Sequence, residues 1–179
     1  MEIFFSLEKS IVEWFYYHRQ PPLNYFFLTI TYLGTGWVIL PLLTFISFIK
    51  KRLPLLWTFL LSLIFLDLTI RCLKHLINRP RPVKLIPNFE VIGPLLKYGS
   101  FPSGHTALAF LTASFLSQIF PKYMWIFYFM AFLVGISRIY LGVHFPSDVI
   151  CGGALGYLTG KGGWWIKKKM ERKNEKRSN

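Results

Sequence analysis

The stretch Ser137-Arg138-Ile139-Tyr140-Leu141-Gly142-Val143-His144-Phe145-Pro146-Ser147-Asp148 joins two apolar runs and holds an Arg, a His and an Asp. Charged groups at membrane depth are costly, so their presence there indicates a function or a partner. If a helix begins near Pro146, Asp148 lies in its first turn, close enough to hold the His144 imidazole through one ring nitrogen. The other nitrogen is then free to attack or to move a proton, while Arg138 supplies a fork of donors that suits phosphate.

The composition is typical of an integral membrane protein. The 179 residues are 53% hydrophobic and 18% aromatic, which is rare in a soluble domain. The formal net charge is +13, and much of it borders apolar runs. The lipid bilayer is therefore the expected partner rather than nucleic acid. Cys72 and Cys151 lie in apolar segments without a spaced Cys/His set, so neither a disulfide framework nor a metal site is indicated.

Residues 2–18 have the pattern of an amphipathic helix. Apolar residues recur at helical spacing, namely Ile3, Phe4, Leu7, Ile11, Trp14 and Phe15. Charged residues fall on the other faces, namely Glu2, Glu8, Lys9 and Glu13. Because the segment is short and charged for a membrane span, we expect it to lie in the plane of the membrane interface. The alternative is an ordinary soluble helix packed on a loop.

Five further apolar runs approach or reach the roughly 20 residues that cross about 30 Å of hydrocarbon. They predict transmembrane helices over residues 24–49, 53–77, 103–120, 123–140 and 146–166, followed by a basic tail over 167–179. The expected fold class is all-α: one polytopic helical membrane bundle over residues 1–179, with about five transmembrane helices and an N-terminal interfacial helix.

Two smaller patterns refine this bundle. Gly152, Gly156 and Gly160 are each four residues apart and in line with Asp148, which indicates close approach of a neighbouring helix. Residues 78–102 form one long, proline-rich connection, and long loops inside compact domains are often functional.

The distribution of charge predicts the topology. Five spans place the chain ends on opposite sides, so that Lys50-Lys51-Arg52, Lys122 and the tail share one side. The positive-inside rule makes that side cytoplasmic. The long connection and the turn from Arg138 to Asp148 share the other side. The connection is itself basic, with Lys84 and Lys97 among its charges, and we attribute these charges to an anionic ligand.

Three polar clusters end on that outer side. The first extends from Lys74 to Arg81-Pro82, the second is Pro102-Ser103-Gly104-His105, and the third is Ser137-Arg138 with His144 and Asp148. Several Arg and Lys side chains on one rim indicate a multiply charged anion. Ser103 is a candidate N-cap, and free amides at a helix N-terminus are a ready phosphate site. Asp67 and Arg71 are spaced to pair, and substrate contact by these two residues stays open.

In this order, the pieces Lys-x6-Arg-Pro, Pro-Ser-Gly-His and Ser-Arg-x5-His-x3-Asp resemble the signature of the type 2 phosphatidic acid phosphatase superfamily. Each piece alone is weak. Three complete pieces in order, each at the same end of an apolar run, are specific. The resemblance covers roughly residues 74 to 148, and the flanking spans fit the helical membrane members of the family. Those members often have six spans, against the five expected here.

The resemblance implies a metal-independent phosphatase that needs no cofactor and forms a phosphohistidine intermediate. By position, His144 is the nucleophile, Asp148 orients it, and His105 is the general acid. The phosphate-binding residues implied are Lys74, Arg81, Ser103, Gly104 and Arg138. The residue types support this chemistry, because a neutral imidazole held by a carboxylate is a competent nucleophile. A phosphoryl transition state also requires several fixed donors.

The expected function is removal of a phosphate from a lipid in the outer leaflet of a bacterial inner membrane, with the site facing the periplasm. The short chain and the amphipathic N-terminal helix look most like lipid A 1-phosphatases, while undecaprenyl-diphosphate and phosphatidylglycerol phosphate phosphatases share the signature. A lipid-binding or transport protein is the non-enzymatic rival, and a binder needs no nucleophile. Soluble acid phosphatases and haloperoxidases also share the signature, but the spans argue against a soluble form. No obligate protein partner is indicated.

Overall fold

The computed structural model describes residues 2–50, 53–94 and 99–178. In these ranges the elements are α1 (Glu2–Tyr17), α2 (Pro21–Tyr32), α3 (Gly36–Ile49), α4 (Leu53–Ile77), α5 (Pro82–Leu85), α6 (Gly104–Ile119), the 3-10 turn η1 (Pro121–Tyr123), α7 (Met124–Tyr140) and α8 (Pro146–Ser178). No strand occurs among them, so the predicted all-α fold class is confirmed. Lys51, Arg52 and Lys97, which entered the topology prediction, lie outside the described residues.

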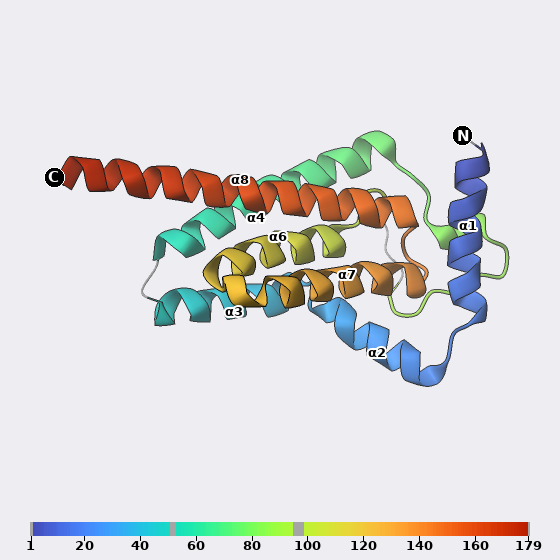
Figure 1. Cartoon of the computed structure of the whole chain (residues 1–179). Coiled ribbons are helices and arrows are strands. Elements are labelled where there is room, and N and C mark those ends of the chain that lie inside the picture. Colours follow the sequence, from blue (N-terminus) through green and yellow to red (C-terminus); the bar gives the residue numbers. More distant parts are fainter. Residues whose placement is uncertain (1, 51–52, 95–98, 179) are drawn as a thin grey trace.

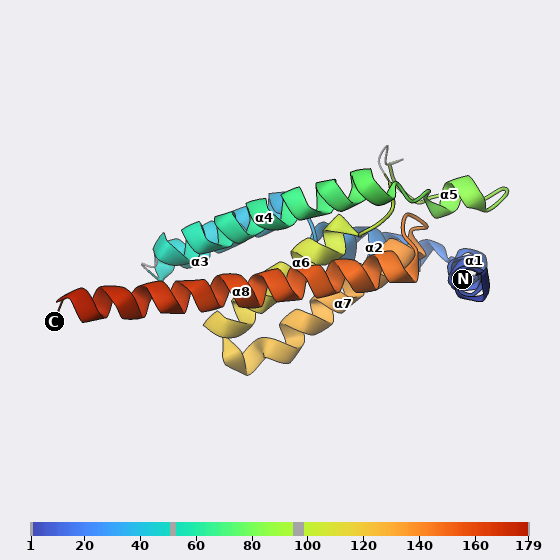
Figure 2. The same cartoon turned by 90° about the horizontal axis from the view of Figure 1, so that it is seen from above.

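The helices α3, α4, α6, α7 and α8 run alongside one another, and α1 lies across one end of this bundle (Figures 1 and 2). At that end α4 and α7 finish while α6 and α8 begin (Figure 1). The three polar clusters predicted from the sequence therefore meet at one end of the bundle. The C-terminal end of α8 lies at the opposite end (Figure 1).

Helix α6 is the inner element of the bundle, and it packs against α8 almost backbone to backbone. Added at Gly152, a Cβ would come within 2.5 Å of the Ser103 carbonyl oxygen. Added at Gly156, it would collide with the Ala107 carbonyl oxygen. Without side chains at these positions the two helix starts adjoin, and the Ser103 amide donates to the Asp148 carbonyl at 2.9 Å. The glycine pattern thus marks the close approach that it predicted.

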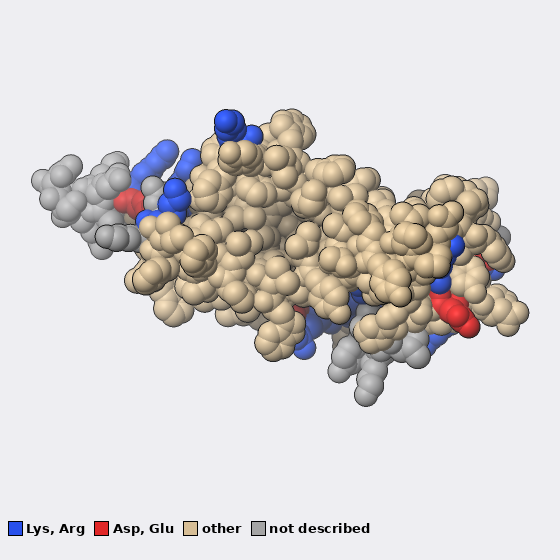
Figure 3. Space-filling view, turned by 90° about the horizontal axis from the view of Figure 1, so that it is seen from below, with Lys and Arg blue, Asp and Glu red and all other residues tan. Residues whose placement is uncertain are grey.

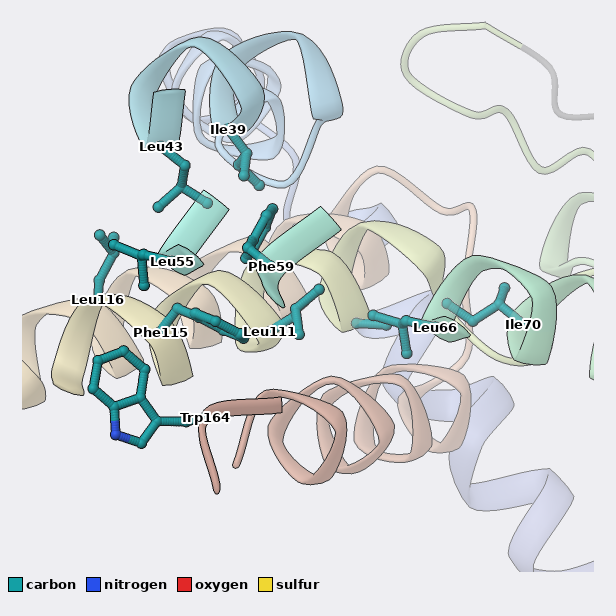
Figure 4. Packing of buried hydrophobic residues seen from close by; sticks show 11 residues of the cluster. Ile39, Leu43, Leu55, Phe59, Leu66, Ile70, Leu111, Phe115, Leu116 and Trp164 are labelled. Atoms are coloured by element: carbon teal, nitrogen blue, oxygen red, sulfur yellow. The ribbon is translucent and has the colours of Figure 1, made fainter. Parts of the chain in front are cut away.

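Aromatic packing joins α6 to α4 and α8 further along the bundle (Figure 4). The Phe59 and Phe115 rings meet edge to face with centroids 5.2 Å apart, and Phe115 meets Trp164 in the same way at 6.1 Å. Phe59 and Phe115 are fully buried. Because lipid tails are as apolar as these side chains, close packing rather than the hydrophobic effect holds such helices together in a membrane.

The predicted helix over residues 24–49 is corrected to two helices. α2 and α3 meet at a bend of 50°. The bend occurs where Gly34 passes close to α6 and α7, since a Cβ there would lie 2.7 Å from Val134 and 2.8 Å from the His105 carbonyl oxygen. Gly34 and Gly36 lie at this break, and glycine is a poor helix former. Two further bounds differ: α8 continues to Ser178 instead of ending at 166, and the 78–102 connection contains α5.

Within the described part of the chain, two helical stretches are long and apolar enough to cross a membrane, Leu53–Leu85 and Pro121–Tyr140. The bent pair of α2 and α3 provides a third if it is one span. Helix α6 has 16 residues, and the second half of α8 is highly charged. Five spans therefore remain a prediction. Figure 3 shows a face whose central area is uncharged, with Lys and Arg around its edge, at both ends and at the upper and lower margins.

Helix α1 differs from its predicted surface pattern at one position. Ile3, Phe4 and Trp14 are exposed, as expected of a helix that faces lipid. However, Glu8, which the pattern assigned to a polar face, is 3% exposed, and Val12 one turn later is fully buried. The side of α1 that faces the bundle is thus part apolar and part acidic.

The close approach of α6 and α8 predicts a position-specific effect of small substitutions. Gly156→Ala should lower thermal stability, because overpacking a tight contact costs about 1–3 kcal/mol. Gly162→Ala is the control on the same helix, since nothing lies within 4 Å of its Cβ position. That variant should be neutral or slightly stabilising, because Ala is the better helix former. Unfolding temperatures in detergent micelles measure both, and equal temperatures would contradict the packing described.

Candidate active site

His144 and Asp148 form a buried pair where the α7–α8 turn enters α8. The imidazole Nδ1 lies 3.4 Å from Asp148 Oδ2, with 2% of the His144 side chain and none of the Asp148 side chain exposed. This distance is long for a hydrogen bond, and Nδ1 has no closer partner among the described residues. Asp148 therefore faces this ring nitrogen without a formed hydrogen bond.

The backbone of the turn fixes this pair. Gly142 has φ +79°, a conformation that side chains disfavour, and a Cβ there would also strike the Phe89 ring. The amides of Val143 and His144 both donate to the Arg138 carbonyl at 3.2 Å. The sharp reversal after α7 therefore delivers the imidazole to the start of α8.

Burial holds the His144 imidazole neutral. Loss of solvent lowers its pKa to about 3, and the positive charges of Arg138 and Arg81 act in the same direction against the opposing effect of Asp148. The neutral ring has a lone pair available at physiological pH, which is the state that a nucleophile requires.

Lys74 and Arg81 converge beside this ring from the end of α4 and the following connection. Both donate to the Gly99 carbonyl, Lys74 Nζ at 2.8 Å and Arg81 Nη2 at 3.2 Å. Arg81 Nη1 also lies 3.4 Å from His144 Nε2, the ring nitrogen on the side away from Asp148. The predicted cationic cluster is thus at the nitrogen that would attack.

Arg138 is buried nearby, with 6% of its surface exposed. Its Nη1 donates to Thr31 Oγ1 at 2.8 Å, but its Nε has no hydrogen-bond partner within the residues the structure describes. A buried donor without a partner is costly unless a ligand satisfies it. This orphaned donor among several cations favours binding of an anion.

The start of α6 holds the second predicted cluster. Ser103 occupies the N-cap position, but the proposed cap is corrected: its hydroxyl pairs with Thr106 Oγ1 at 2.9 Å, and no side-chain cap bond forms. Gly104 and His105 line a cleft of about 390 Å³. The cleft lies between α4, α6 and the bend that joins α2 to α3.

Asp67 lines the same cleft from α4. Its carboxylate accepts from Arg71 Nε at 2.6 Å, so the predicted ion pair forms. Both side chains are at least half exposed, and exposed pairs contribute little to stability. The position of Asp67 beside His105 makes it a candidate for contact with whatever fills the cleft.

Sequence reasoning missed two charged groups at the site, Arg79 and Glu8. Arg79 Nη1 donates to Asp148 Oδ1 at 2.8 Å, and its Nη2 donates to Glu8 Oε2 at 2.6 Å. The repeated Arg-Pro at residues 79–82 was an available signal for Arg79. Glu8 gave no signal, because its partner lies 71 positions away in the chain.

A family model described as "PAP2 superfamily" matches residues 55–172, which include all three polar clusters. Phosphatidylglycerophosphatase B of Bacillus subtilis is 38% identical over 160 residues, a match that covers 78% of this chain and 73% of that protein. A lipid A 1-phosphatase of Porphyromonas gingivalis is 45% identical over 71 residues, covering 37% of this chain and only 16% of that protein.

A solved structure shares the fold. The crystal structure of Aquifex aeolicus LpxE superposes with a TM-score of 0.78 at 35% identity, covering 87% of this chain and 93% of that one. Over most of the chain, the arrangement of the helices is therefore a known architecture. The resemblance drawn from the motifs is confirmed at the level of the family.

The lowered pKa of His144 predicts that its ring stays neutral in mild acid. In protein labelled with ¹⁵N-histidine, the His144 signals are identified as those that the His144→Asn variant lacks. Their chemical shifts should not change between pH 7.5 and 5. Free histidine in the same sample, with a pKa of about 6.5, should titrate fully over that range. Because the pKa of His144 is lower in the folded chain than in the unfolded chain, protonation favours unfolding. The stability that the neutral ring contributes is therefore lost as the pH falls below about 6.5. Titration of the His144 signals near pH 6.5 would contradict the buried neutral ring.

Proposed function

The chain belongs to the PAP2 superfamily, and on this premise we propose that it is an integral-membrane lipid phosphatase that works through a phosphohistidine intermediate. The observation that carries the proposal is the buried imidazole of His144, with Asp148 on one side and Arg81 on the other. A protein that only binds lipid phosphate requires the cations but has no use for the oriented nucleophile. Neither a metal nor a cofactor is needed for this chemistry.

In the first step, His144 Nε2 attacks phosphorus, the bond from phosphorus to the leaving oxygen breaks, and His105 gives its proton to that oxygen. Asp148 at Nδ1 stabilises the positive charge that develops on the imidazole ring. In the second step, water attacks phosphorus and gives a proton to His105 as the bond from nitrogen to phosphorus breaks. Lys74, Arg81 and the free Nε of Arg138 are the donors that balance the charge on the phosphoryl oxygens.

The position of the cleft supports a lipid as the leaving group. His105 lines the cleft together with exposed Trp37 and with Leu66 and Ile70 of α4, so the leaving group would extend along an apolar flank of the bundle. We propose lipid A 1-phosphate as the substrate, on the similarity to a relative of that name. Undecaprenyl diphosphate and phosphatidylglycerol phosphate are the alternatives, the latter favoured by the longer match to the Bacillus subtilis relative.

Phosphate release from a panel of purified lipids tests the substrate. Lipid A 1-phosphate, undecaprenyl diphosphate and phosphatidylglycerol phosphate are offered in mixed micelles with EDTA present. We expect metal-independent release, fastest from lipid A. A different preferred lipid would replace the substrate assignment. Binding without any release would support the non-enzymatic rival, and activity that needs a divalent ion would contradict the mechanism.

The same assay separates the two histidines. His144→Ala should abolish the acid-labile phosphoenzyme on every substrate. His105→Ala should slow the first step most for lipids, because a general acid contributes about 10²–10⁴-fold and matters most for a basic leaving oxygen. An aryl phosphate with a good leaving group should therefore rescue His105→Ala more than His144→Ala. Equal losses on both substrates would overturn this division of roles.

We further propose that the protein lies in a bacterial inner membrane with α1 in the interface and the site facing the periplasm. The basic end of α8 lies at the end of the bundle opposite the site, as expected of a cytoplasmic tail (Figure 1). A cysteine introduced at Lys84 should react with an impermeant thiol reagent in intact spheroplasts. A cysteine at Lys168 should react only after lysis. The reverse pattern would invert the topology.

A further inference from the structure

We propose that Glu8 and Arg79 are positioning residues for His144, so that α1 holds the nucleophile in place through a chain of charged contacts. This inference rests on the proposed phosphatase function. It concerns two groups that are not among the donors proposed for the phosphoryl oxygens. Arg79 donates to the carboxylates of Glu8 and Asp148 and not toward the cleft.

All four carboxylate oxygens of Asp148 and Glu8 accept a hydrogen bond. Asp148 Oδ1 accepts from Arg79 at 2.8 Å, while Oδ2 accepts from the Phe145 amide at 2.9 Å and faces His144 Nδ1. Glu8 Oε2 accepts from Arg79 at 2.6 Å, and its Oε1 accepts from the Ser147 amide at 2.7 Å. Glu8 thus binds both Arg79 and the first turn of α8.

Two further contacts hold the Arg79 side chain in place. Its Nη1 also donates to Ser147 Oγ at 2.7 Å, and its guanidinium carbon lies 4.3 Å from the centre of the Phe145 ring. The side chain is 17% exposed. A planar fork that spans two carboxylates is specific to arginine, because lysine offers a single charged nitrogen.

The sign of the charges gives Glu8 an electrostatic role as well. Arg79 alone would neutralise Asp148 and weaken its support for a ring that becomes positive when Nε2 attacks phosphorus. With Glu8 present, the trio carries two negative charges and one positive charge, a net −1 at His144. Buried ion pairs contribute little to stability after desolvation, so stability alone does not account for this arrangement.

This arrangement joins the membrane surface to the chemistry. The inner side of α1 is fixed by Val12, which is fully buried, and by Phe5, whose ring lies 5.8 Å from that of Phe145. Its outer side presents exposed Ile3 and Phe4. One face of α1 is turned toward lipid, and Glu8 on its other face pairs with Arg79. The geometry of His144 therefore depends on the position of α1 at the membrane surface.

The test compares Glu8→Gln and Arg79→Lys with a control on the same helix, Glu13→Gln. Glu13 pairs with Lys9 at 3.7 Å in a partly exposed position. Glu8→Gln keeps the shape and removes the charge. We expect kcat to fall roughly 10–100-fold in both test variants with KM unchanged, the range for losing a buried hydrogen bond to a charged group. Glu13→Gln should stay within about twofold, as expected of an exposed ion pair.

Two further measurements separate positioning from a merely structural role. In an Asp148→Asn background, Glu8→Gln should cause no further loss of residual activity, because its path to His144 is already cut. The ¹⁵N signals of His144 should shift in Glu8→Gln and not in Glu13→Gln, a readout that does not need turnover. If the wild type releases no lipid phosphate but these signals shift, the proposed function fails and the positioning contact stands. Wild-type kcat with unshifted signals, or equal losses with and without Asp148, would overturn the inference.

Discussion

A carboxylate with no solvent contact must have its charge satisfied by the protein, and Asp148 is such a group. The hydrogen bonds that satisfy this charge join the segments at the end of the bundle. One oxygen takes the arginine that follows α4, the other takes a backbone amide from the α7–α8 turn, and its own carbonyl receives the amide that precedes α6. Two segments distant in sequence, at Arg79 and Ser103, thus converge on Asp148 together with the turn that precedes it, and this fixes the place of the neighbouring His144.

Around this anion the chain gathers more positive charge than it balances. Lys74 and Arg81 both donate to the Gly99 carbonyl. Arg138 Nε has no hydrogen-bond acceptor in the described structure. Cations held close together repel one another, and burial strengthens that repulsion. A bound phosphate would relieve it and supply the missing acceptor. The cluster is therefore electrostatically suited to an anion, and fixed donors of this kind are what the stabilisation of a charged transition state requires.

The sequence predicted the helices and the three clusters because both are local signals. Apolar runs marked the helices, and motif spacing brought His144 to Asp148 within one turn. It did not predict the α2–α3 bend, although Gly34 and Gly36 inside the apolar run were an available signal. The close contacts of Gly34 are to Val134 and His105 on other helices, which a local pattern does not show. The sequence also did not predict the burial of Glu8. A helical pattern shows which faces differ, but the partner that makes an acid tolerable inside comes from a distant part of the chain.

Helix α8 also sets a length. Asp148 lies in its first turn, and Lys168 follows 20 residues later in the same unbroken helix. At about 1.5 Å per residue the two are about 30 Å apart along the axis, which is about the thickness of the hydrocarbon core. Exposed Trp165, with Lys169 over its ring at 5.2 Å, is a residue pair typical of the headgroup boundary. The helix therefore has the length that the predicted span requires, because its basic end and the end that meets His144 are separated by about the thickness of the hydrocarbon core.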